Sequence, residues 1–166
     1  MILGAVLVGG RSSRFGSDKA QAMFGTERLR DHAAALLASI CDSVVLVGGG
    51  AIPDLPEPHL GPLGGVAAAL DHAASHGFAS VLTIGCDMPR LPASLLHALI
   101  RRAPAYCVEA PVLGHWPAAL GAQLLGHLTT EPDRSVCRWA RTIGAVPIAA
   151  GEPIANINTP EDLLVL

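Results

Sequence analysis

The sequence predicts an α/β fold: one doubly wound, mostly parallel sheet with helices on both faces, of the Rossmann-like kind. Short, continuously apolar segments alternate along the chain with longer Ala/Leu-rich segments of helical period. This alternation is typical of parallel strands that are buried on both faces. A polar, glycine-rich loop follows the first apolar segment directly. Doubly wound sheets bind ligands beyond the C-terminal ends of their strands, so this loop is the expected start of a binding site.

The composition is that of one folded domain. The chain has 166 residues, of which 51 % are hydrophobic and 15 % are charged, which excludes disorder, a collagen repeat and a coiled coil. We expect residues 1–166 to form a single domain, because this length suits one hydrophobic core. No apolar stretch approaches the ~18 residues that a membrane-spanning helix needs. The apolar run Met1–Val8 lacks the basic flank and cleavage site of a signal peptide, so we expect a cytoplasmic protein.

Charge and cysteine content exclude two further classes. The net charge is −3 and aromatic residues make up 4 % of the chain, whereas nucleic-acid-binding proteins usually have a basic face and aromatic stacking platforms. The four cysteines are scattered without a C-x-x-C pair, which argues against a zinc site or a redox motif. They are Cys41, Cys86, Cys107 and Cys137.

The first half of the chain contains two predicted strands and two predicted helices. Ile2–Val8 is a continuous apolar run of the length of a buried strand. Glu27–Ile40 has the length and spacing of a helix, and Val44–Val47 is a second short apolar run. Residues 48–58 are rich in glycine and proline, so we expect an irregular connection there. Gly61–His76 predicts a loop that leads into a helix.

The second half continues the alternation. Ser80–Ile84 is a third apolar strand, and Pro92–Arg102 begins with proline and continues with helical spacing. Tyr106–Glu109 is a candidate fourth strand. The region Trp116–Ile143 predicts two helices with a break at Thr130–Asp133, where polar residues and proline interrupt the apolar pattern.

The last predicted elements are a short strand and a helix. Val146–Ile148 is apolar and short. Thr159 followed by Pro160 is typical of a helix start, because threonine caps the first turn and proline suits the first helical position.

The loop between the first strand and Lys19 is the most informative segment. Its glycines allow backbone N–H groups to approach phosphate oxygens closely, and Arg11, Arg14 and Lys19 add positive charge. Lys19 is the only lysine in the chain, which favours a specific use of its compact ammonium group. The loop fits neither G-x-G-x-x-G nor G-x-x-x-x-G-K-[ST]. It is therefore either a phosphate-binding loop of another kind or a solvated surface loop.

Four motifs, in order along the chain, carry a resemblance to a known family. Residues 7–19 have the pattern Leu-x-Gly-Gly-x-Ser-x-Arg-x-Gly-x-Asp-Lys. The later motifs are Gly61-Pro62-Leu63-Gly64-Gly65, Cys86-Asp87-Met88-Pro89 and Asn156-Ile157-Asn158-Thr159-Pro160-Glu161-Asp162-Leu163. On these motifs, which span nearly the whole chain, the sequence resembles the nucleotidyltransferases that make molybdopterin dinucleotides, and among them the molybdenum cofactor guanylyltransferases.

The resemblance implies a Mg²⁺-dependent transfer of GMP from GTP to molybdopterin, with release of pyrophosphate. It implies catalytic roles for Arg14, Lys19 and Asp87. The residues that it implies for nucleotide binding are Leu7, Val8, Gly9, Gly10, Lys19, Asp54, Gly61 and Asp87. The protein would be a monomer or a weak homo-oligomer, and its contact with cofactor-delivery proteins or molybdoenzymes would be transient.

Asp87 has a chemical reason for its role that does not depend on the resemblance. It follows the third predicted strand directly, at the strand end where ligands bind. Mg²⁺ typically takes one or two protein carboxylates together with substrate phosphates. The family's metal-binding aspartate corresponds to Asp87. The alternative is an aspartate that merely caps a turn.

Base recognition is implied for Asp54 and Gly61. A carboxylate can accept the two N–H groups on the Watson–Crick edge of guanine, and Asp54 lies seven residues before Gly61, at the family's offset. Gly61 and the residues after it would present backbone near the base and ribose. The alternatives are a solvated loop aspartate and a plain turn before a helix.

The second substrate, molybdopterin, is implied to contact residues in the last third of the chain. Asn156 and Asn158 could bind phosphate or assist the metal without adding charge. Cytidylyl-type relatives more often have aspartate at these positions, so the resemblance favours guanine over cytosine as the base. A pterin could stack on Trp116, and Arg134 could pair with its phosphate. The alternatives are core packing for Trp116 and a solvated helix face for Arg134.

Two departures from the family keep other functions open. The connection after Val47 is short, and the family's Gly-Lys-Pro-Leu is replaced by Gly25-Thr26-Glu27-Arg28-Leu29, which removes a lysine. One alternative is a related nucleotidyltransferase that uses CTP or another phosphorylated acceptor. The other is a non-catalytic nucleotide-binding homologue.

Overall fold

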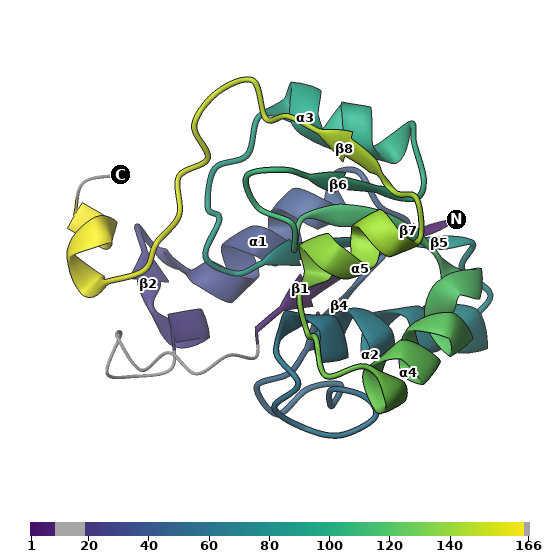
Figure 1. The fold of residues 1–166 in the computed structure, drawn as a ribbon. Helices are drawn as coiled ribbons and strands as arrows, with labels where there is room; N and C mark the ends of the chain where they lie inside the picture. The colour runs from purple at the N-terminus through teal and green to yellow at the C-terminus, as the bar shows by residue number, and fades with distance from the viewer. Residues whose placement is uncertain (9–18, 165–166) are drawn as a thin grey trace.

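The computed structural model describes residues 1–8 and 19–164, and these form a six-stranded sheet covered by helices (Figure 1). The strand order is β4-β1-β5-β7-β6-β8, and only the pairs that involve β7 are antiparallel. The predicted α/β fold with a mostly parallel sheet is confirmed. The strands are β1 (Ile2–Leu7), β4 (Ser43–Val47), β5 (Ser80–Gly85), β6 (Ala105–Cys107), β7 (Gly114–Pro117) and β8 (Val146–Ile148).

The three parallel strands β4, β1 and β5 end in register. β1 lies between β4 and β5, and Leu7 is opposite both Val47 and Gly85. The side chains of β1 and β5 are buried on both faces of the sheet, which is why these two strands are mostly apolar, whereas β4 lies at the sheet's edge and is partly exposed. The loops that follow them therefore leave the sheet from one edge, where a doubly wound sheet binds its ligand.

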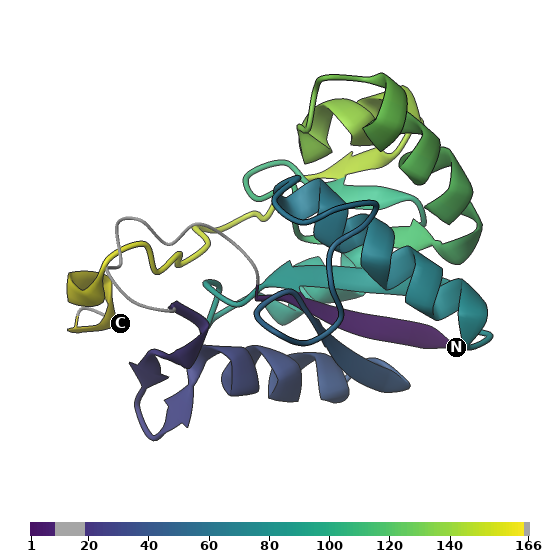
Figure 2. The same ribbon diagram turned by 90° about the horizontal axis from the view of Figure 1, so that it is seen from below.

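Helices cover the two faces of the sheet separately (Figures 1 and 2). On one face, α1 (Leu29–Ala38) and α3 (Ala93–Ile100) share a core with the sheet. On the other face, a second core contains α2 (Pro62–Ser75), α4 (Gly121–Thr130) and α5 (Val136–Thr142). Within the described residues, no helix combines the length and apolar character needed to cross a membrane.

The region that begins at Trp116 is not helical throughout, and this part of the prediction is wrong. Trp116 belongs to β7, and a 3₁₀ helix at Ala118–Leu120 connects β7 to α4. The indole N–H of Trp116 donates to Thr83 Oγ1 at 2.9 Å, and its ring packs on Trp139 with centroids 5.0 Å apart. These tertiary contacts hold the segment extended, whereas its own sequence contains only weak strand signals.

Two smaller differences concern the segments beside the sheet edge. A hairpin of β2 (Met23–Phe24) and β3 (Glu27–Arg28) turns at Gly25 and delays the start of α1 by two residues. The C-terminal helix is a 3₁₀ helix at Pro160–Leu164. The carboxylate of Asp162 accepts from the backbone N–H groups at positions 158 and 159.

Candidate active site

The predicted phosphate loop is only partly described. Gly9, Gly10 and Arg14 lie outside the described residues. Lys19 starts a short 3₁₀ helix at Lys19–Gln21, but its side chain is outside the described part. Val8 donates from its backbone N–H to the carbonyl of Val47 at 2.8 Å. The chain therefore enters the loop at the C-terminal edge of the sheet, and the phosphate-binding roles stay predictions.

Asp54 lies against the first turn of α2, beside the end of β1. The backbone N–H of Leu55 donates to the carbonyl of Gly64 at 3.2 Å. A methyl group on Gly65 would lie 3.6 Å from Asp54 Oδ1 and 3.2 Å from Leu7 Cδ2. The structure thus brings Leu7, Asp54 and the glycines after Gly61 together, as an adjacent set of predicted nucleotide-binding residues.

The carboxyl group of Asp54 has an altered acidity. Partial burial raises the pKa of Asp54 above its ordinary value, and the nearby His59 opposes this shift. A carboxylate at the start of a helix also faces the positive end of the helix dipole. Hydrogen-bond donors from a ligand would stabilise its charged form.

Asp87 lies just beyond β5, and its carboxylate turns back over the strand. Asp87 Oδ1 occupies the space that a side-chain carbon on Gly85 would take. The carbonyl of Asp87 accepts from the backbone N–H of Ile157 at 2.9 Å, and Arg90 forms an isolated antiparallel bridge with Ala155. The C-terminal segment therefore runs along the loop that carries Asp87.

The asparagines of the C-terminal segment lie at this same edge. Ile157 is fully buried against Leu29, whereas Asn156 and Asn158 on either side of it are exposed. Alternating residues of an extended segment point to opposite sides, so both asparagines face away from the core. The backbone of residues 156–158 therefore lies beside Asp87, although Asn156 follows Asp87 by 69 positions in the sequence.

These oxygen donors suit Mg²⁺ better than a transition metal. Carboxylate and amide oxygens are hard ligands, and Mg²⁺ keeps several positions for water and substrate phosphates. Among the described residues no group of three or more His, Cys, Asp or Glu side chains gathers. One carboxylate, on a loop that is bonded to a segment with two exposed asparagines, fits a metal that arrives with a triphosphate.

The prediction that Trp116 stacks on a pterin is wrong. Its ring is 0 % exposed and lies between Thr83 and Trp139 in the core. The adjacent His115 is also buried, and its Nδ1 donates to the Leu99 carbonyl at 3.0 Å. Burial lowers the pKa of His115, so its ring is neutral and its Nε2 accepts from Ser80 Oγ at 2.8 Å.

Arg134 lies in the connection between α4 and α5, where it donates to the carbonyl of Glu131. It is partly exposed, and its role with a substrate phosphate stays a prediction. Gly85 was not predicted to belong to the site, although the Asp87 carboxylate lies over it. Its sequence signal is a glycine at the end of a strand, two residues before the candidate metal ligand.

Residues 4–143 match the family described as the MobA-like NTP transferase domain. The chain belongs to this family. Curated members of known name align over almost the whole length of the chain. A molybdenum cofactor guanylyltransferase of Rhizobium leguminosarum bv. trifolii is 35 % identical over 187 positions, which cover 98 % of this chain and 90 % of that protein. The protein of the same name from Rhodobacter capsulatus is 32 % identical, with 98 % and 93 % covered.

Solved structures share the fold of this MobA-like nucleotidyltransferase. The molybdopterin-guanine dinucleotide biosynthesis protein A of Archaeoglobus fulgidus has a TM-score of 0.74 at 20 % identity, with 98 % of this chain and 95 % of that chain covered. The 2-C-methyl-D-erythritol 4-phosphate cytidylyltransferase of Thermus thermophilus has a TM-score of 0.68 at 17 % identity, with 97 % and 95 % covered. The fold alone therefore does not select the nucleotide.

Proposed function

We propose that this chain is a molybdenum cofactor guanylyltransferase, which transfers GMP from GTP to molybdopterin and releases pyrophosphate. The structural observation that supports the proposal is the backbone contact between the Asp87 loop and the segment that carries Asn156 and Asn158, at the C-terminal edge of the sheet. The near full-length similarity to relatives of that name supports the choice of reaction.

The proposed reaction needs positioning more than it needs a protein nucleophile. A phosphate oxygen of molybdopterin forms a bond to the α-phosphorus of GTP, and the bond from that phosphorus to the bridging oxygen of pyrophosphate breaks. Asp87 would hold Mg²⁺, which, when bound, neutralises charge on the phosphates. Asn156 and Asn158 would orient phosphate oxygens through their side-chain N–H groups. Fixing both reactants in line supplies much of the rate increase.

Guanine recognition is assigned to Asp54. Its carboxylate lies beside Leu7 and the first turn of α2, where it could accept from the N1–H and N2–H groups of guanine. Adenine and cytosine do not present this pair of donors.

Replacing Asp54 by asparagine is expected to weaken GTP binding about 10- to 100-fold, because an amide cannot accept two hydrogen bonds with a full negative charge. Calorimetry in the presence of Mg²⁺ measures the affinities of the wild type and the variant for GTP, CTP and ATP. Asp71→Asn, at an exposed position on α2, is the control and should bind as the wild type does. Unchanged GTP affinity in Asp54→Asn would exclude the assigned role.

The same assignment predicts a pH dependence. The pKa of Asp54 is raised, and only the ionised carboxylate accepts both donors. GTP affinity should therefore fall as the pH decreases towards that raised pKa, and Asp54→Asn should remove this component of the pH profile.

A further inference from the structure

His32, near the start of α1, is bonded to the loop that carries Asp87. Its Nε2 lies 2.7 Å from the carbonyl oxygen of Pro89, 57 positions away in the sequence. A carbonyl oxygen can only accept, so Nε2 carries the proton and donates. The bond is partly buried and connects α1 to residues 87–90.

The imidazole is held in this orientation from two further sides. The ring of Phe24 contacts it edge-on, with centroids 5.4 Å apart and an interplanar angle of 71°. Glu27 Oε2 lies 3.8 Å from Nδ1. Phe24 and Glu27 are paired in the β2–β3 hairpin, so this hairpin and the bond to Pro89 together orient the ring.

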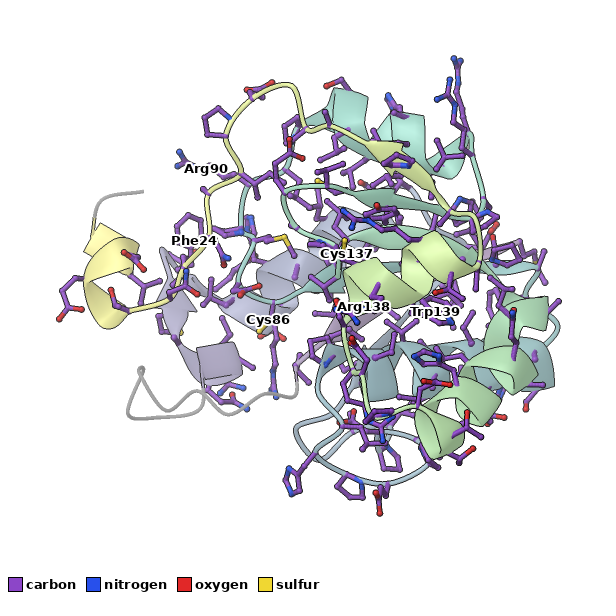
Figure 3. The ribbon with its side chains drawn as sticks, in the orientation of Figure 1. Phe24, Cys86, Arg90, Cys137, Arg138 and Trp139 are labelled. Carbon is purple, nitrogen blue, oxygen red and sulfur yellow. The ribbon has the colours of Figure 1, made fainter. Side chains whose placement is uncertain are left out.

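Three segments contact the loop after β5. His32 of α1 donates to Pro89, and the guanidinium of Arg90 lies 5.9 Å from the ring centroid of Phe24 in β2. Figure 3 labels Phe24 and Arg90. From the C-terminal segment, the Ile157 N–H and the bridge at Ala155 hold the same loop. Asp87, Pro89 and Arg90 are each held by one of these contacts, and Asp87 is the candidate metal ligand.

We propose that His32 is a positioning residue: its bond to Pro89 fixes the loop that presents Asp87 and so sets the affinity for the metal–triphosphate. The proposal rests on the proposed function for its link to the metal. His32 itself acts only through the loop. Outer contacts that orient a metal ligand commonly contribute 10- to 100-fold to metal affinity.

The first arm of the test needs no ligand. Hydrogen exchange is measured in the nucleotide-free protein for wild type, His32→Ala and His32→Gln. Loss of the hydrogen bond from His32 to Pro89 should increase the exchange rate of the Ile157 amide about tenfold, because that amide bonds to Asp87 in the same loop. Glutamine offers an N–H near the position of Nε2 and should restore slow exchange. His97→Ala, at an exposed position on α3, is the control.

The second arm measures the Mg²⁺ concentration at half-maximal GTP binding by calorimetry. His32→Ala should raise it about tenfold, and His32→Gln should return it towards the wild-type value. If the Ile157 amide of His32→Ala exchanges at the wild-type rate, the proposal is overturned. It is also overturned if that amide exchanges faster but the Mg²⁺ concentration at half-maximal GTP binding is unchanged. Failure of the wild type itself to bind Mg²⁺ and GTP would instead overturn the proposed function, and the exchange data would still decide whether His32 holds the loop.

Discussion

Replacing Asp87 by asparagine is expected to lower kcat for dinucleotide formation on the order of a thousandfold, with the fold unchanged by circular dichroism. Asp87 follows β5, its backbone carbonyl is bonded to Ile157, and it is the acidic residue assigned to the metal. An amide of the same size keeps the shape but removes the negative charge. Steady-state release of pyrophosphate, measured at saturating GTP and Mg²⁺, gives the comparison.

Asp71→Asn is the matched control, because it makes the same chemical change at an exposed position on α2. It should retain wild-type activity. A second variant, Gly85→Ala, keeps the carboxylate but places a methyl group where Asp87 Oδ1 lies, so it should raise the Mg²⁺ requirement. Wild-type kcat in Asp87→Asn would rule out Asp87 as the metal ligand.

The largest expected effect on stability comes from Gly114→Ala. A methyl group at Gly114 would overlap the six-membered ring of Trp116, because residues two apart on a strand share a face. The ring has no room to move: it is fully buried, bonded to Thr83 and packed on Trp139. Overpacking of this kind costs about 3 kcal/mol or more in the free energy of unfolding. Urea denaturation followed by tryptophan fluorescence would measure the loss.

Gly126→Ala is the control for this prediction. Gly126 lies inside α4, and a methyl group there would meet no atom within 4 Å. Alanine in a helix interior should stabilise the protein by about 0.5–1 kcal/mol. Equal stability of the Gly114→Ala variant and the wild type would contradict the packing described for Trp116.

The central strands were predictable because burial on both faces leaves a signal in the sequence. Ile2–Leu7 and Ser80–Gly85 are continuous apolar runs, and the structure places both in the parallel part of the sheet. β7 was missed because Gly114–Pro117 is short and contains glycine and proline, which are weak strand formers. Its extended conformation depends on tertiary contacts of Trp116 with residues that are distant in the sequence, so the local sequence does not reveal it.

Some residues of the candidate site could be predicted from local sequence, and others could not. Asp87 could be identified from its position after an apolar strand, and Asp54 only from the family resemblance. The contact between the C-terminal asparagines and the Asp87 loop depends on a backbone bond from Ile157. His32 and Pro89 are 57 positions apart, and a histidine in a helical pattern gives no local sign of such a bond. Long-range bonds of this kind become visible only in the folded chain.

The proposed guanylyltransferase activity is tested most directly by pyrophosphate release from the purified protein with molybdopterin, Mg²⁺ and either GTP, CTP or ATP. We expect release that depends on molybdopterin, matches the guanine dinucleotide formed, and is at least about tenfold faster with GTP than with CTP or ATP. Preference for CTP, or no release with GTP when molybdopterin is supplied, would contradict it.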